Sequence, residues 1–226
     1  QGVKCYHSEH LYGEFWHRAF TVAADVPRCD YVLSFGYNGD ASGGVTGVFR
    51  HAEARVRGLT WVQIEPHLSI TGAGAAQWVP IRPKTDAAVL FALLHVILHE
   101  TDWRRTCDVP FLESMTNSAY LVGPHGYYLR DPESDKPLVW DLDRDRPVPF
   151  DDPRLVRPAL EGKFLAAGVE VGADGERWSV AESVRPAFSL LLHHLLPYTP
   201  EWAETVADVP AATIRRMARE YLEHAN

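Results

Sequence analysis

The sequence predicts an α/β fold: a Rossmann-like three-layer domain with a parallel sheet, plus an irregular insertion with short strands and a set of C-terminal helices. The first observation is the order strand, turn, helix, strand, loop, strand, helix between residues 29 and 100. Parallel strands joined by crossover helices produce this order. The second is that Pro, Gly and Asp become frequent after about residue 120, before helical periodicity returns near residue 184. We expect three parts: 1–120 as the α/β part, 121–180 as the insertion and 181–226 as helices completing the same domain.

In the first part, each element is predicted by its apolar spacing and its end signals. The strands have β-branched, aromatic and aliphatic residues and end at Gly36, at Pro66 and before the polar turn that starts at Arg82. The helix over 45–58 ends at Gly58 and places one apolar face toward the core. The expected elements are a helix over 9–20, a strand over 29–36, the helix over 45–58, strands over 59–66 and 78–81, and a helix over 86–100. The apolar face of the helix over 45–58 comprises Val45, Val48, Phe49, Ala52 and Val56.

In the remainder of the chain, turn residues separate short apolar runs. A hairpin is expected around 124–126, a strand over 137–140, and two strands around a turn at Gly175. Three helices follow, over 184–198, 200–208 and 210–225, the second with Pro200 in its first turn.

Composition limits the possible functions. The chain of 226 residues is 46% hydrophobic and 23% charged, as in ordinary globular proteins. With 22 Lys and Arg against 30 Asp and Glu, its net charge of −8 argues against a nucleic-acid partner. The three cysteines, Cys5, Cys29 and Cys107, are widely spaced, which argues against a disulfide framework and against a paired-cysteine metal motif.

Targeting signals also bear on the class of protein. No apolar run approaches the ~18 residues of a membrane helix, so we expect a soluble chain without direct membrane insertion. The N-terminus has neither an initiator Met nor a signal-peptide pattern, and we expect an excised piece of a longer protein. The compartment stays open, and either the periplasmic or the cytoplasmic face of a bacterial membrane complex is compatible with the sequence.

Candidate binding residues follow the strands, because ligands of open parallel sheets bind at the carboxyl ends of the strands. After the first strand, glycines beginning with Gly36 allow main-chain N–H groups to approach an anion, and Asn38 offers an amide side chain. The segment has no GxGxxG spacing, so a plain turn is the alternative.

Two carboxylates follow the next strands. Glu65 ends its strand, where dinucleotide-binding folds place an acidic residue on the ribose about 20 residues after the glycines. Here the gap is 65 − 36 = 29, and a solvated Glu at a strand end is the alternative. Thr85 and Asp86 begin a helix, where capping explains both residues. Asp86 could also accept hydrogen bonds from the adjacent N1–H and N2–H₂ donors of guanine.

Three stretches carry a family resemblance: "CDYVLSFGYN", "VQIEPHLSITGAGAAQWVPIRPKTDAAVLFALLHVILHE" and "YTPEWAETVADVPAATIRRMAREYLEHAN". Together they resemble the dinucleotide-binding portion of a molybdopterin oxidoreductase of the dimethyl sulfoxide reductase family, over 29–106 and 184–226. "YLVGPHGYYLRDP" is similar to the subgroup of arsenate, tetrathionate and phenylacetyl-coenzyme A oxidoreductases. The chain departs from the family pattern with Glu65 for Asp, His67 for Arg and Lys84 for Gly.

The resemblance implies a cofactor and its binding residues. Molybdenum bis(molybdopterin guanine dinucleotide) would be held through the pyrophosphate or guanosine by Gly36, Tyr37 and Asn38. In the same way Glu65 and Pro66 would meet the ribose, and Thr85 and Asp86 the guanine. Cys5 falls near the position of the family's molybdenum ligand, and His10 could line the substrate funnel beside the metal.

The resemblance also implies partners and an activity. An iron–sulfur cluster would lie in another domain of the same polypeptide, and an iron–sulfur partner protein would exchange electrons with the enzyme. The reaction would be two-electron oxo transfer or hydroxylation of a small-molecule substrate, with this fragment inactive alone.

Other readings remain open. A nucleotide-dependent enzyme of Rossmann type would require a GxGxxG near residue 36, and a non-enzymatic α/β interaction module would leave Glu65 and Asp86 without a role. The histidine pairs, His95 with His99 and His193 with His194, are interpreted as core or surface residues rather than metal ligands. His7 and His17, like His10, lack a carboxylate at a known zinc-site spacing.

Overall fold

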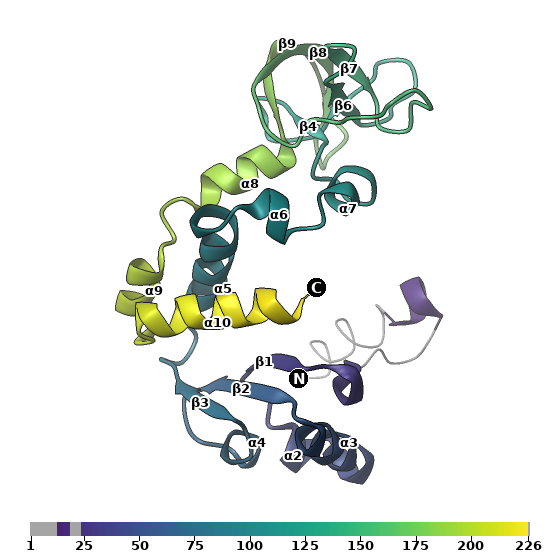
Figure 1. Cartoon of the computed structure of the whole chain (residues 1–226). Helices are drawn as coiled ribbons and strands as arrows, with labels where there is room; N and C mark the ends of the chain where they lie inside the picture. The colour runs from purple at the N-terminus through teal and green to yellow at the C-terminus, as the bar shows by residue number, and fades with distance from the viewer. Residues whose placement is uncertain (1–12, 19–23, 226) are drawn as a thin grey trace. The chain divides into compact units, whose positions relative to one another are not determined.

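The computed structural model describes residues 13–18 and 24–225 (Figure 1). The chain divides into two compact units, one formed by Gln1–Asp86 with Glu223–Asn226 and the other by Ala87–Leu222. The boundary falls at the start of a helix, within the segment 1–120 that the sequence pattern groups together.

The first unit contains the predicted parallel sheet. Its strands are β1 (Tyr31–Phe35), β2 (Thr60–Glu65) and β3 (Gln77–Pro80), and they lie in the order β1-β2-β3. Phe35 lies opposite Ile64, and Glu65 lies opposite Pro80. Because all three strands run in one direction, the segments that follow them leave the sheet at the same edge. The predicted α/β class is confirmed.

Short helices connect these strands. The α-helices are α2 (Gly39–Ser42), α3 (Gly44–Arg57) and α4 (Ile70–Ala73), and shorter turns of other types cover Gly13–His17 and Val26–Arg28. As predicted, α3 ends at Gly58, whose φ of 113° only glycine adopts readily. The Gly-rich stretch after β2 has the composition of a loop, but it contains α4, which the hydroxyl of Ser69 caps by accepting from the Gly72 N–H at 3.1 Å.

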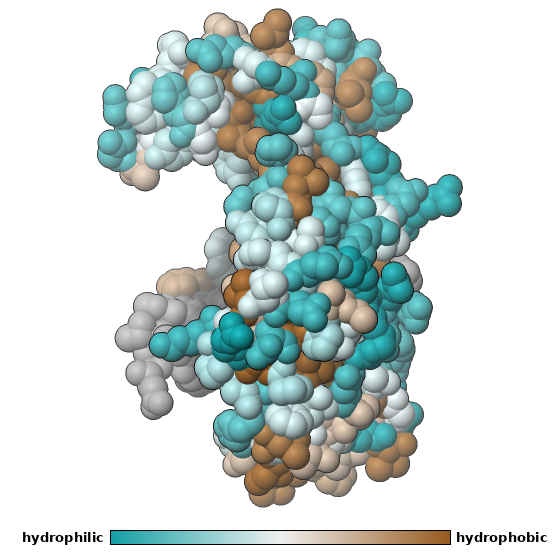
Figure 2. All heavy atoms as spheres, turned by 90° about the vertical axis from the view of Figure 1, so that its left-hand side faces the viewer, coloured by the Kyte–Doolittle hydropathy of each residue, from teal (hydrophilic) through white to brown (hydrophobic). Residues whose placement is uncertain are grey.

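The predicted orientation of α3 is wrong. Val45, Phe49 and Val56, expected in the core, have exposed fractions of 89%, 66% and 90%. The buried face instead carries His51 and Ala54. Apolar spacing alone cannot foresee this, because the side of α3 that faces β2 is held there by polar partners described below. Figure 2 shows apolar side chains at the surface of the end of the molecule where Figure 1 draws α2, α3 and α4.

The second unit holds two antiparallel sheets rather than an irregular insertion. One has four strands in the order β4-β9-β8-β5, and the other pairs β6 with β7. Their bounds are β4 (Leu121–Val122), β5 (Leu129–Arg130), β6 (Leu138–Asp141), β7 (Arg146–Pro149), β8 (Phe164–Val171) and β9 (Arg177–Pro186). The predicted turn at Gly175 joins β8 and β9, with a φ of 85°. At the predicted hairpin, Val122 bridges Tyr128, but the two strands pair mainly with β9 and β8.

Helices complete this unit. They are α5 (Asp86–His95), continued by a π-helix over Val96–Glu100, then α6 (Trp103–Thr106), α7 (Val109–Ser114), α8 (Ala187–Leu195), α9 (Pro200–Ala207) and α10 (Ala211–His224). The helix expected from residue 184 begins only at Ala187, because β9 continues to Pro186. Pro200 occupies the first turn of α9 as predicted, and the Thr199 hydroxyl caps that helix.

Two apolar clusters form the core of the second unit. One gathers Leu98, Trp103, Val139 and Leu195 around the helices, and the other packs the strands around Trp140, which stacks on Phe164. Among the residues that the model describes, no helix is both long and apolar enough to cross a membrane.

Candidate functional site

The loop after β1 is open at its first residue. Gly36 has a φ of 61°, and its N–H donates to the Ile64 carbonyl at 2.9 Å. A Cβ built on Gly36 would meet no atom within 4 Å, so glycine is needed there for its main-chain conformation rather than for lack of room. The space beside this turn is therefore free for a ligand.

Asn38 is held from the inside of the loop. Its Oδ1 lies 3.2 Å from the hydroxyl oxygen of Thr71 and 3.4 Å from the main-chain nitrogen of the same residue. The Thr71 hydroxyl oxygen in turn lies 2.9 Å from the main-chain nitrogen of Asp40. One buried hydroxyl on α4 thus bonds two residues of the loop after β1.

A buried ion cluster fastens the same loop to α3. Asp40 Oδ1 lies 2.7 Å from His51 Nδ1, and Asp40 Oδ2 accepts from Arg55 Nη1 at 2.7 Å. Burial alone would raise the pKa of Asp40, but the hydrogen bonds with His51 and Arg55 outweigh it and lower that pKa below its usual value. Because these groups need one another, they turn the polar side of α3 inward and leave its apolar side outside. The sequence pattern did not indicate this cluster, whose members lie up to 15 residues apart.

Glu65 is buried rather than solvated, with 4% of its surface exposed. Its Oε1 accepts from the Ser69 N–H at 2.7 Å, and its Oε2 accepts from Gln63 Nε2 at 3.0 Å. Gln63 also donates to the Tyr37 carbonyl at 3.1 Å and accepts from Trp61 Nε1 at 2.9 Å. Glu65 therefore organises the turn between β2 and α4 and, through Gln63, supports the loop after β1. Pro66, which follows it, is exposed.

The turn after β3 leads into α5. Lys84 adopts the left-handed conformation, with a φ of 68°. The Thr85 hydroxyl donates to the Arg82 carbonyl at 2.6 Å and so closes the turn, rather than serving as the expected helix cap. Asp86 lies half-buried in the first turn of α5. Within the described residues its carboxylate has no hydrogen-bond or ion-pair partner, so it is free to accept from a ligand.

The segments containing Gly36, Pro66 and Asp86 all follow strands of one parallel sheet and lie at its carboxyl edge. This edge therefore combines an open glycine turn, an amide with a fixed orientation and an unpaired carboxylate. Those groups can bind, respectively, a phosphate, an oxygen acceptor and a pair of N–H donors.

Other predicted residues do not form a site in the described part of the chain. His95 and His99 each make a 2.9 Å hydrogen bond to a main-chain carbonyl, of Leu195 and Leu192, in keeping with their interpretation as structural residues. In the ranges 13–18 and 24–225, no group of three or more His, Cys, Asp or Glu side chains could hold a metal. Cys5, His7 and His10 lie outside the described residues, as does the side chain of His17.

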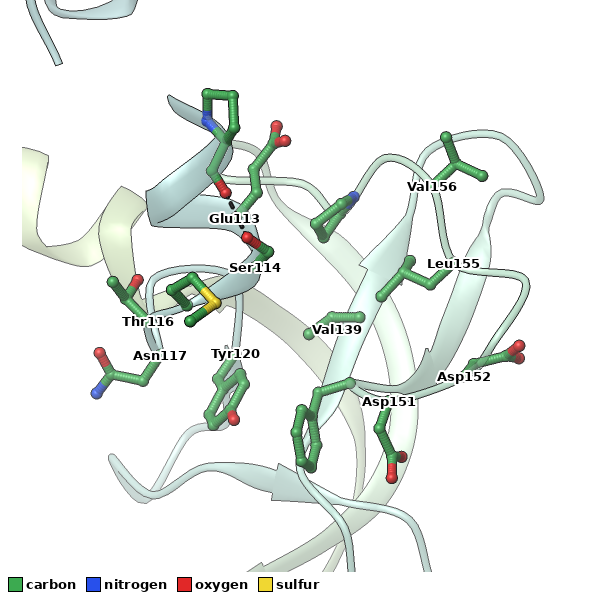
Figure 3. A pocket seen from close by; sticks show the side chains of 14 residues that line it. Glu113, Ser114, Thr116, Asn117, Tyr120, Val139, Asp151, Asp152, Leu155 and Val156 are labelled. Atoms are coloured by element: carbon green, nitrogen blue, oxygen red, sulfur yellow. Dashed lines mark hydrogen bonds between the residues drawn. The ribbon is translucent and has the colours of Figure 1, made fainter. Parts of the chain in front are cut away.

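A separate hollow of about 760 Å³ lies in the second unit, between α7 and the β6–β7 hairpin (Figure 3). Val139, Leu155 and Tyr120 lie around its middle, while the carboxylates of Glu113 and Asp152 lie at its edges. Burial raises the pKa of Glu113 and, together with nearby Tyr128 and Asp151, that of Tyr120. The pattern of residues gave no sign of this hollow, since its lining comes from several distant turns.

Comparison with known proteins gives the chain relatives. No family model matches it. It is 35% identical to a molybdenum-enzyme relative, the sulfite dehydrogenase of Allochromatium vinosum, over 75% of this chain and 17% of the matched polypeptide of that enzyme. It is 28% identical to the dimethyl sulfoxide reductase DmsA of Haemophilus influenzae, over 94% of this chain and 20% of that protein. It is 33% identical to the thiosulfate reductase molybdopterin-containing subunit PhsA of Salmonella typhimurium, over 42% of this chain and 12% of that protein.

The chain thus spans at most about a fifth of the length of these relatives. The solved structure of acetylene hydratase from Pelobacter acetylenicus matches 84% of this chain and 16% of its own, with 16% identity and a TM-score of 0.47. A likeness so distant carries no weight for the site.

Proposed function

Because this chain belongs to the dimethyl sulfoxide reductase family of molybdopterin oxidoreductases, we propose that it forms the part of such an enzyme that holds one guanine dinucleotide arm of the cofactor. The observation that supports this most is the unpaired carboxylate of Asp86, at the same sheet edge as the open turn at Gly36. The proposal covers a fragment, and the activity of the whole protein is part of it.

The residues present fit the cofactor in their chemistry. Guanine offers two adjacent donors, N1–H and N2–H₂, and a carboxylate such as Asp86 accepts both. The pyrophosphate needs N–H donors and room for close approach, which Gly36, Tyr37 and Asn38 provide at the open turn. Glu65 has its oxygens engaged inside the protein, so its role is to hold the turn on which the ribose, beside Pro66, would rest.

In the whole enzyme the molybdenum centre supplies two-electron chemistry, such as oxo transfer or hydroxylation of a small-molecule substrate. This chain's residues bind and orient the cofactor, and Cys5 and His10 remain candidates for the metal ligand and the substrate funnel. An iron–sulfur cluster in another domain and an iron–sulfur partner protein would carry the electrons.

Metal and nucleotide content of the full-length protein test the proposal. Purified protein should contain molybdenum, and hydrolysis of the cofactor pyrophosphate should release GMP. Asp86→Asn replaces an acceptor oxygen by a donor that repels the guanine edge, and GMP per chain should fall roughly tenfold, as for the loss of a charge-assisted hydrogen bond. The control Glu53→Gln changes an exposed carboxylate on α3 and should keep wild-type GMP. A wild-type protein without molybdenum and GMP contradicts the proposal, and an Asp86→Asn protein with full GMP removes the role of Asp86.

A further inference from the structure

We propose that Thr71 is a positioning residue, whose buried hydroxyl turns the side chain of Asn38 so that its Nδ2 donors face the pyrophosphate oxygens of the cofactor. This inference rests on the proposed function and extends it to a residue on α4 that the sequence pattern did not single out. It rests on the direction of each hydrogen bond around one hydroxyl.

The first step concerns the proton of the Thr71 hydroxyl. The main-chain nitrogen of Asp40 can only donate, so at 2.9 Å the Thr71 oxygen accepts from it. The hydroxyl proton is then available to donate to the next neighbour, Asn38 Oδ1, at 3.2 Å. The hydroxyl is therefore both acceptor and donor, and Thr71 has no exposed surface on which water could take either role.

The second step fixes the orientation of the Asn38 amide. The main-chain nitrogen of Thr71, 3.4 Å from the Asn38 side chain, is also a donor only. Two donors of Thr71 thus meet the same side-chain atom, which must be the oxygen. The Nδ2 group then lies on the other branch of the amide, away from Thr71, and within the described residues it has no partner. Asn38 is half-buried and the neighbouring Gly36 and Tyr37 are exposed, so an outside ligand can reach this group.

The third step explains why the arrangement is rigid. Asp40, whose N–H is bound to Thr71, is fastened to α3 through His51 and Arg55. Arg55 also reaches the Thr71 carbonyl at 3.5 Å. The loop after β1, α3 and α4 are thereby joined around Asn38. A donor held in place before the ligand binds loses little entropy on binding, which favours affinity.

The fourth step is the choice of ligand group. An amide Nδ2 group carries two N–H donors and no charge, so it binds oxygen acceptors. The acceptors expected beside the open turn at Gly36 are the oxygens of a pyrophosphate, which main-chain N–H groups of the same turn can also approach.

Three variants of the full-length protein test the inference. Thr71→Val keeps the shape and removes the hydroxyl, Thr71→Ser restores the hydroxyl, and Asn38→Asp keeps the Oδ1 acceptor for Thr71 but replaces the donors by a negative oxygen. Two quantities are measured, the hydrogen-exchange rate of the Asp40 amide and the GMP released per chain. The exchange rate does not require the cofactor.

In Thr71→Val the Asp40 amide should exchange about tenfold faster, and GMP per chain should fall by a similar factor. Thr71→Ser should return both quantities toward wild type. Asn38→Asp should leave the exchange of the Asp40 amide at the wild-type rate and still lose GMP about tenfold, because a carboxylate repels phosphate.

The outcomes separate the two proposals. Wild-type GMP in Asn38→Asp overturns the inference, whether or not Thr71→Val folds. Faster exchange in Thr71→Val with undiminished GMP overturns it as well, since the hydroxyl would then hold the loop without affecting the cofactor. Absence of GMP from the wild-type protein instead defeats the proposed function, and the inference with it, whatever the exchange rates are.

Discussion

The Nδ1 atom of His125 lies 2.6 Å from Oε2 of Glu170, and this carboxylate has no exposed surface. Glu170 also accepts from the main-chain nitrogens of His125 and Tyr127, at 3.1 and 2.9 Å. A side chain on β8 thus satisfies the turn between β4 and β5, and the rings of His125 and Tyr127 both stack on Trp178 of β9. Gly123 belongs to the same arrangement, because a Cβ placed on it would lie 2.4 Å from the carboxyl carbon of Glu170.

Replacing Glu170 by Gln should destabilise the second unit. The amide offers only one acceptor oxygen to the donors of the turn, and its NH₂ group would face an N–H group. We expect the free energy of unfolding to fall by about 1–3 kcal/mol. Urea-induced unfolding measures it, with Glu182→Gln, an exposed change on β9, as the control. A loss in Glu170→Gln no larger than in the control would show that the turn does not depend on this carboxylate.

Lys84 carries a conformational cost that glycine would remove. Its φ of 68° is unfavourable for a residue with a Cβ. Lys84→Gly should therefore be more stable toward urea than Lys84→Ala by about 1 kcal/mol. Comparing these two variants removes the effect of the lost charge, which is common to both. Equal stabilities would mean that the left-handed conformation is not kept in solution.

Arg215 should give part of the stability of the second unit its acid dependence. Its guanidinium pairs with Glu100 and with Glu201, at 2.7 and 2.6 Å. The hydrogen bond from Arg215 lowers the pKa of Glu201 from 4.5 to about 2. A depressed pKa stabilises the folded state above the unfolded value, so this contribution is present above pH 4.5 and is lost as the pH falls toward about 2. The stability difference between wild type and Arg215→Met should be largest near neutral pH and should shrink over that interval, as followed by urea unfolding at each pH.

The two faces of α3 should respond oppositely to substitution. Phe49→Lys lies on the exposed apolar face and should change the free energy of unfolding by no more than about 0.5 kcal/mol. Ala54→Val lies on the buried face against Trp61, where the added methyl groups should cost about 1–3 kcal/mol. Thermal unfolding of both variants checks this. A large loss in Phe49→Lys would restore the orientation that the apolar spacing predicted.

Local signals were sufficient for most elements of the first unit. The strands at 31–35, 60–65 and 77–80 have mainly apolar or β-branched residues, and Gly58 ends its helix for a reason that a sequence displays. Asp86 at the start of α5 was likewise predictable, since a polar turn precedes a long apolar helix.

Partnerships between distant residues were not predictable. The bond from Thr71 to Asn38 spans 33 positions, and nothing in either segment marks the other. The burial of Glu65 depends on Gln63 and on the small helix α4, so an apparently solvated carboxylate becomes an internal one. In the second unit, β4 and β5 look like one hairpin, but each pairs mainly with a longer strand far along the chain. The roles of Cys5 and His10 stay predictions, because both lie outside the described residues.

The contact between Gly123 and Glu170 has a consequence for how this protein can evolve. Any side chain at position 123 would collide with the carboxylate, and a shorter residue at position 170 would strand the main-chain donors above it. Neither position can drift independently. In descendants of this sequence the two should be inherited as a matched pair, or exchanged together in a single compensated step.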